Sequence, residues 1–172
     1  MTGETAVIVG AGPGLGAALA RRFANAGMNI ALASRKLFRL EPLAQELIAL
    51  GVRSRAYACD ATVEKQVEEL FLRVQSDLGT PDLVVYNAGA FVPKGLIETS
   101  AEEFERCWRV GCYGGFLAGR DPPQIELRLL QHGAVFHDLL FRRNYESICI
   151  ISFCRSLLAA HCARKKPAIK NV

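Results

Sequence analysis

Four glycines alternate with other residues near the start of this 172-residue chain, at Gly10, Gly12, Gly14 and Gly16. Glycine lets a backbone approach a phosphate closely because it carries no side chain. An apolar run at residues 6–9 precedes the cluster, and an alanine-rich run follows from Ala17. This order predicts a buried strand, a tight turn and a helix whose first N–H groups, near Leu15 and Gly16, hold a dinucleotide pyrophosphate. The alternative is a strand-to-helix turn that binds no ligand.

Polar residues follow three further apolar runs, at residues 28–34, 53–59 and 83–86. If these runs are parallel strands, their carboxyl ends meet at one edge of a sheet, where ligands bind in folds of this kind. We therefore expect a second group of cofactor contacts there. Its members are Ser34, Arg35, Asp60, Ala61, Asn87, Ala88 and Gly89.

Arg35 follows the second predicted strand, where the ribose of the adenosine half would lie. NAD-binding folds usually place an acid at this point to bind the 2′-hydroxyl group. A guanidinium favours a 2′-phosphate instead, through two parallel hydrogen bonds, and Lys36 adds a second positive charge. The sequence therefore favours NADP over NAD as the cofactor. The alternative is that both residues form a solvated helix start.

The roles of Asp60 and Asn87 stay open at this point. The Asp60 carboxylate could accept a hydrogen bond from the adenine amino group, or it could cap the following helix. Thr62 is a second candidate cap for that helix. The Asn87 side chain could bond neighbouring backbone and so hold the sheet and the cofactor ribose, or it could only begin a turn.

Helical patterns separate the predicted strands. Apolar residues recur at helical spacing over residues 37–48 and 63–78, and Ser100 with Glu103 forms a capping-box pattern ahead of a third helix. We expect that third helix to turn Phe104, Trp108 and Phe116 inward. Strands that alternate with helices predict an α/β fold with a doubly wound, Rossmann-type parallel sheet, incomplete in the C-terminal half of the chain.

Together these motifs resemble those of the short-chain dehydrogenase/reductase family. The spacing Gly10-x-x-x-Gly14-x-Gly16 resembles the family's glycine motif, Asp60 resembles its adenine-contacting acid, and Asn87-Ala88-Gly89 resembles its Asn-Ala-Gly motif. The resemblance covers residues 5–120. It implies hydride transfer between NAD(P)H and a carbonyl or alcohol substrate, often in a tetramer.

The catalytic residues that this resemblance implies are not recognisable, so we assign none. The family uses a serine and a Tyr-x-x-x-Lys pair, in which the lysine lowers the pKa of the proton-transferring tyrosine. Here Tyr113 and Tyr145 are followed four residues later by Leu117 and Cys149. Gly111 stands where the family has a catalytic asparagine. We expect a nucleotide-binding chain that lacks turnover; the alternative is a non-enzymatic nucleotide-binding or interaction module that uses its tail.

Composition divides the chain near residue 120. The first 120 residues carry 13 basic and 13 acidic side chains, so the net charge of +4 comes from the remainder, which also holds only one of the 15 glycines. We interpret residues 1–120 as an incomplete NAD(P)-binding domain and residues 121–172 as an atypical tail of low order. A shifted reading frame would explain the change, and an authentic divergent C-terminus is the alternative.

Without a regular fifth strand, the strand at 83–86 should expose an edge that favours self-association or aggregation. Residues 133–136 could pair as a substitute strand, and residues 148–158 could cover apolar surface. We expect no nucleic acid partner, because the first 120 residues are neutral overall. We also expect no membrane span, no metal site and a cytoplasmic location, because no signal-peptide pattern or zinc-ligand spacing is present.

Overall fold

The computed structural model describes residues 3–120 and 148–149. Its core is a parallel sheet in which the strands lie in the order β3-β2-β1-β4-β5. This order is that of a doubly wound sheet, in which the chain starts in the middle and moves outward to each side. The predicted fold class is therefore confirmed. The strands are β1 (Thr5–Val9), β2 (Asn29–Ser34), β3 (Ser54–Ala58), β4 (Leu83–Tyr86) and β5 (Ile148–Cys149).

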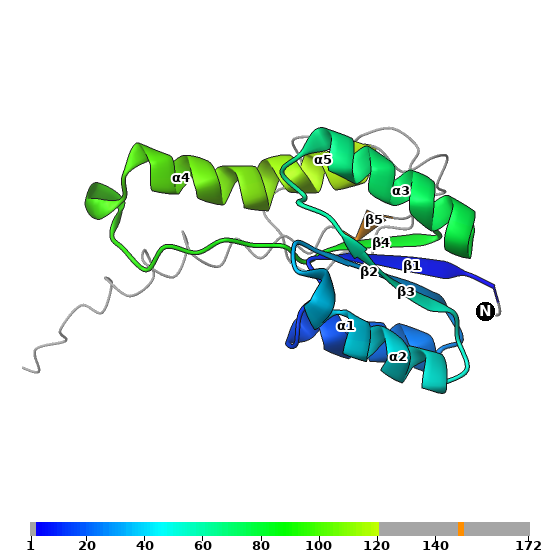
Figure 1. Cartoon of the computed structure of the whole chain (residues 1–172). Coiled ribbons are helices and arrows are strands. Elements are labelled where there is room, and N and C mark those ends of the chain that lie inside the picture. The colour runs from blue at the N-terminus through cyan, green and yellow to red at the C-terminus, as the bar shows by residue number, and fades with distance from the viewer. Residues whose placement is uncertain (1–2, 121–147, 150–172) are drawn as a thin grey trace, which may run out of the picture.

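Helices cover both faces of the sheet (Figure 1). One face packs on α1 (Leu15–Asn25) and α2 (Glu41–Ala49), and the other on α3 (Glu64–Leu78) and α5 (Gly114–Arg120). Successive residues of a strand point to opposite faces. Along β1, Ala6 and Ile8 thus belong to the first core, and Val7 and Val9 belong to the second. Because both faces are buried, the central strands are mainly apolar, with polar residues at their ends.

The second predicted helix is divided in two. A 3₁₀ turn over Leu37–Arg39 comes first, and α2 begins only at Glu41. Pro42 explains this start, because a proline lacks an N–H group and is accepted in the first turn of a helix but not further along. The helices predicted around residues 17–27 and 63–78 are confirmed as α1 and α3.

The far side of β4 is paired, contrary to the expected open edge. Val84 and Val85 of β4 pair in parallel with Ile148 and Cys149 of β5. The substitute strand thus comes from residues 148–149, which we had expected to cover apolar surface. Residues 133–136, the expected substitute, lie outside the described residues. Within the described residues, this ladder pairs two residues of each strand.

The third predicted helix forms a long rod, in which α5 lies over the sheet and α4 continues beyond it (Figure 1). It consists of α4 (Ala101–Trp108), a π-helical turn over Arg109–Tyr113, and α5. Phe104 and Trp108 are 53% and 46% exposed, so the expectation that they point inward was wrong. A π turn inserts one extra residue, which rotates the following helix by about 100° relative to the preceding one. Phe116 does pack against the core, as predicted, because it lies beyond this rotation.

Within residues 3–120 and 148–149, no helix combines the length and the apolar character that crossing a lipid bilayer requires.

Candidate functional site

The glycine turn begins at Gly10, directly after β1, where the backbone lies close to the residues that follow β4. Gly10 has a φ of +87°, which L side chains rarely adopt, and its N–H donates to the Ala33 carbonyl at 2.9 Å. A Cβ atom on Gly10 would lie only 2.6 Å from Cα of Ala88. Both the backbone angle and the missing space therefore require glycine here.

The start of α1 is open toward the turn. Gly14 is the N-cap residue and offers no side-chain acceptor, and Cβ atoms on Gly12 or Gly14 would meet nothing within 4 Å. In the part of the chain that the structure describes, no hydrogen bond has the amide of Gly14, Leu15 or Gly16 as its donor. These amides are the unsatisfied donors of a helix N-terminus, where anions bind.

Asn87 holds the ends of two strands together. Its side-chain Nδ2 donates to the Gly10 carbonyl at 3.1 Å, and its own N–H donates to the Val9 carbonyl at 2.7 Å. The bond to neighbouring backbone, one of the two alternatives for this residue, is therefore present. Its proposed contact with the cofactor ribose stays a prediction, as do those of Ala88 and Gly89. Gly89 is exposed and has open space where a Cβ would lie.

Asp60 closes a turn between β3 and α3. Its Oδ1 accepts from the Thr62 amide at 2.9 Å and from the Thr62 hydroxyl at 2.7 Å. The N-cap of α3 is Val63, with no side-chain cap, so the predicted Thr62 cap was wrong. Thr62 lies one residue before the N-cap, and its hydroxyl donates a hydrogen bond to Asp60 instead. Among the described residues, Oδ2 of Asp60 accepts no hydrogen bond, which leaves it available for a ligand such as an adenine amino group.

The end of β2 presents a cation without a partner. The Ser34 carbonyl accepts from the Cys59 amide at 3.0 Å, and the Ser34 hydroxyl accepts from the Lys36 amide at 3.3 Å. These bonds fix the turn that carries Arg35. The Arg35 side chain is exposed and makes no hydrogen bond or ion pair within the described residues.

A hollow of about 320 Å³ lies between these strand ends and α4. Arg35, Asp60 and Thr62 line it from the sheet side. The α4 side was missed by sequence reasoning, because none of the cofactor motifs falls on this helix. The α4–π residues that line it are Glu102, Glu105, Arg106, Arg109 and Val110.

Tyr86 joins the end of β4 to the π turn and was also missed. It is fully buried, and its hydroxyl donates to the Val110 carbonyl. Burial, and next the nearby Asp60 carboxylate, raise the pKa of Tyr86, so the hydroxyl keeps its proton. Gly114 makes room for it, since a Cβ there would lie 2.8 Å from the Ala61 carbonyl oxygen and closer still to the tyrosine hydroxyl. The Gly114-Gly115 pair inside a predicted helix was the signal for such a close approach.

The structure thus gathers the predicted residues along the carboxyl ends of four parallel strands. The glycine turn, the Asp60 turn and the Asn87 link meet at this edge, beside the open start of α1. Such a turn, leading from the central strand into a helix at the point where strand order reverses, defines a dinucleotide-binding domain of the Rossmann class.

The family follows from comparison with known proteins. A family model described as short chain dehydrogenase matches residues 4–121. The chain is 38% identical over 114 residues to glycine betaine reductase of Emericella nidulans, and this match covers 66% of the chain and 9% of the reductase. The chain belongs to the short-chain dehydrogenase family. Among the first curated relatives, it spans between 9% and 47% of their own lengths.

Solved structures agree with this assignment. An alcohol dehydrogenase from Thermococcus sibiricus, complexed with 5-hydroxy-NADP, is 37% identical with a TM-score of 0.67; the match covers 69% of this chain and 51% of that one. A blue fluorescent protein from a metagenomic library, in complex with NADPH, is 31% identical with a TM-score of 0.66; the match covers 70% and 50%. Both neighbours were solved with nicotinamide cofactors of the NADP type bound.

Proposed function

We propose that the chain binds a nicotinamide dinucleotide across the carboxyl ends of its strands, as the cofactor-holding part of an oxidoreductase. The observation that carries this proposal is the open start of α1. The free amides of Gly14, Leu15 and Gly16 face a turn in which Gly12 and Gly14 leave space for a pyrophosphate. The adenosine half then lies toward Ser34, Asp60 and Ala61, and the nicotinamide half lies toward Asn87, Ala88 and Gly89.

The proposed cofactor is NADP rather than NAD. Arg35 follows β2, where the ribose 2′ position would lie, and it has no carboxylate partner in the described residues. A free guanidinium there matches a phosphate and would leave the 2′-hydroxyl of NAD without an acceptor. The solved neighbours with bound NADPH and 5-hydroxy-NADP support the same choice.

When bound, the nicotinamide would supply or accept a hydride, and the relatives point to carbonyl or alcohol substrates. In this proposal the residues of the chain bind and orient the cofactor, but the sequence lacks the Tyr-x-x-x-Lys pair that moves the proton in the family it resembles. No tyrosine of the 172 residues stands four positions before a lysine, and Gly111 has no side chain with which to order a water or a lysine. We propose that this polypeptide binds the cofactor without turnover.

A fluorescence titration with NADPH and NADH, followed by a reductase assay on a panel of carbonyl compounds, tests the proposal. Saturable NADPH binding that Gly14→Asp abolishes, with no turnover, is the expected result, because a carboxylate at the helix start repels the pyrophosphate. Turnover would contradict the catalytic part of the proposal. If neither dinucleotide binds, the proposed function is wrong.

We also propose that the chain self-associates. Phe104 and Trp108 are half exposed on the rod, and the described residues pair with β4 on its outer side at Val84 and Val85. Exposed apolar surface of this kind favours association. Sedimentation velocity over a range of concentrations tests this idea, and a monomer at all concentrations would refute it.

A further inference from the structure

The hollow beside Arg35 has two walls that carry cations. Arg35 and Asp60 come from the sheet side, and Arg106 and Arg109 come from the rod. The cofactor motifs in the sequence include residues of the sheet side of the hollow only. No residue of α4 belongs to any of these motifs. A ligand in the hollow would touch both walls.

The three arginines of the hollow differ in their partners. Nε of Arg109 lies 3.1 Å from Oε1 of Glu105, so this cation is already neutralised. The guanidinium groups of Arg35 and Arg106 make no hydrogen bond or ion pair within the described residues. The Arg106 charge does help to lower the pKa of Glu103, whose carboxylate is bonded to Lys94 instead. Among the described residues, each wall of the hollow therefore carries one guanidinium with no direct carboxylate partner.

The charged residues that line the hollow indicate which ligand it can bind. Oδ2 of Asp60 can accept a hydrogen bond from a ligand, whereas the guanidinium groups of Arg35 and Arg106 can bind an anion. Glu102 also lines the hollow and would repel an anion at the α4 wall. An adenosine 2′-phosphate carries both features, a donating amino group and a phosphate.

We propose that Arg106 is a second specificity-determining residue, which clamps the cofactor 2′-phosphate against Arg35 from the opposite wall. This inference rests on the proposed cofactor site and deepens it. Arg106 acts on the phosphate alone, so it distinguishes NADPH from NADH. A guanidinium that only stacked on the adenine ring would instead support both dinucleotides equally.

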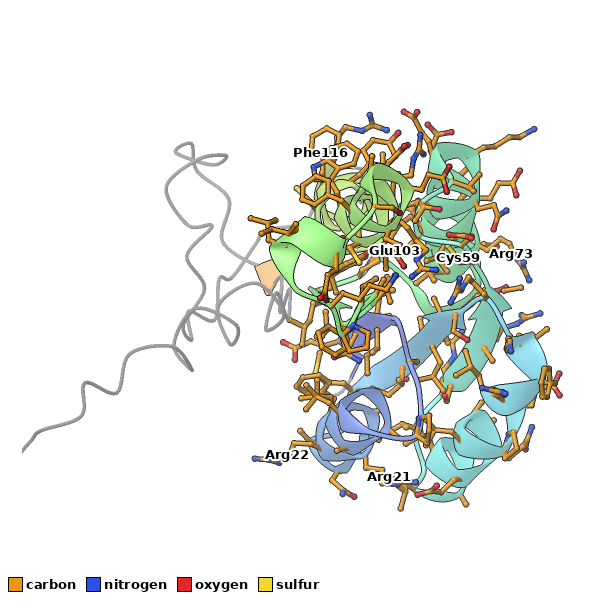
Figure 2. The ribbon with its side chains drawn as sticks, turned by 90° about the vertical axis from the view of Figure 1, so that its left-hand side faces the viewer. Arg21, Arg22, Cys59, Arg73, Glu103 and Phe116 are labelled. Atoms are coloured by element: carbon orange, nitrogen blue, oxygen red, sulfur yellow. The ribbon has the colours of Figure 1, made fainter. Side chains whose placement is uncertain are left out.

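Matched charge variants test the clamp. Arg106→Gln is expected to weaken NADPH binding about tenfold, as for a lost hydrogen bond to a charged group, while NADH binding stays within about twofold. Glu102→Gln removes the repelling charge and should tighten NADPH binding about threefold. The control is Arg22→Gln, which makes the same charge change at an exposed position of α1. Figure 2 shows Arg22 at the end of the molecule away from Phe116 of the rod.

The outcomes separate the two proposals. If wild-type protein prefers NADPH and Arg106→Gln keeps that preference, the clamp is wrong and the proposed function stands. Equal weakening of both dinucleotides also refutes the clamp, in favour of adenine stacking. Wild-type protein that binds neither dinucleotide nor adenosine 2′,5′-bisphosphate overturns both proposals. Circular dichroism spectra of the variants that match wild type establish that each has folded.

Discussion

Gly10 has a structural role, since its positive φ and its close contact with Ala88 bring the ends of β1 and β4 together at the edge where we propose that the cofactor binds. We expect Gly10→Ala to lower the free energy of unfolding by more than about 1 kcal/mol, because a Cβ is strained at this φ and collides with backbone. Urea unfolding measures the change. Gly12→Ala is the control, because its Cβ would meet nothing within 4 Å. Equal effects of the two variants would contradict the argument.

Cys59 lies 3% exposed at the end of β3. Burial, and next the Asp60 carboxylate, raise the pKa of its thiol to about 11, so the thiolate needed for alkylation is scarce at pH 8. We expect iodoacetamide to modify Cys107 and Cys112, which are partly exposed, long before Cys59. Peptide mapping by mass spectrometry follows each site. Rapid labelling of Cys59 in folded protein would refute the prediction, and labelling in urea is the control.

At this scale the sequence predicted backbone roles better than side-chain roles. The Asn87 bond to Gly10 was one of two alternatives, and it could be foreseen because an amide after a buried strand must pair with neighbouring backbone. The partner of Tyr86 and the proposed role of Arg106 could not be foreseen. The Gly114-Gly115 pair indicates a close approach, but it does not say which side chain approaches. Arg106 shares the hollow with Arg35, a residue far away in sequence, and no local pattern records that neighbourhood.

Among the elements, α4 has a defined start. Ser100 Oγ accepts from the Glu103 amide at 3.2 Å, and Oε2 of Glu103 accepts from the Ser100 amide at 3.0 Å. Lys94 Nζ also lies 2.6 Å from Oε1 of Glu103. We expect Ser100→Ala to lower the free energy of unfolding by about 1 kcal/mol, as for other lost N-caps. Chemical denaturation at pH 7 measures this, with Ser76→Ala at an exposed position of α3 as the control.

The same capping box predicts a pH dependence. The hydrogen bond from Lys94, and next the one from the Ser100 amide, hold the pKa of Glu103 below its ordinary value. A depressed folded-state pKa stabilises the fold fully above the unfolded value of about 4.3, and the contribution is lost as pH falls through the folded value. Stability of wild type should thus fall more steeply below pH 4.3 than that of Glu103→Gln. Parallel curves for the two proteins would contradict this.

The rod shows why the elements were predicted better than their faces. The Ser100 start was visible as a capping-box pattern, and Phe104 and Trp108 have helical spacing. The π turn at Arg109–Tyr113 then changes the phase between these residues and Leu117. The sequence pattern did not reveal the extra residue of the π turn. Phe104 and Trp108 were therefore predicted to face the core, although they face solvent.

For the whole molecule, the proposed cofactor is expected to stabilise the fold, because it binds only when the strand ends are assembled. At a free NADPH concentration of about one hundred times its Kd, the free energy of unfolding should rise by about 2.7 kcal/mol. Thermal unfolding with NADPH, and with Arg35→Gln as the comparison, measures this shift. An unchanged midpoint for wild type at saturating NADPH would contradict the prediction.

The fold class was predictable as a whole because each of the first four strands is followed by a helix, and three of these strands are mainly apolar. Right-handed crossovers between such parallel strands then place helices on both faces of the sheet. The β5 pairing was not predictable, because Ile148 and Cys149 lie far along the chain in a segment without a regular period.

Because all strands run one way, the sheet also has an opposite rim, made of the strands' starting ends. There the Thr5 amide donates to Oδ2 of Asp82 at 2.7 Å, and the Thr5 hydroxyl donates to the Leu78 carbonyl at 3.0 Å. None of the residues assigned to the cofactor lies on that rim. Substitutions on that rim should therefore change the thermal stability of the protein without changing its selectivity between the two dinucleotides. The two properties could then be engineered separately.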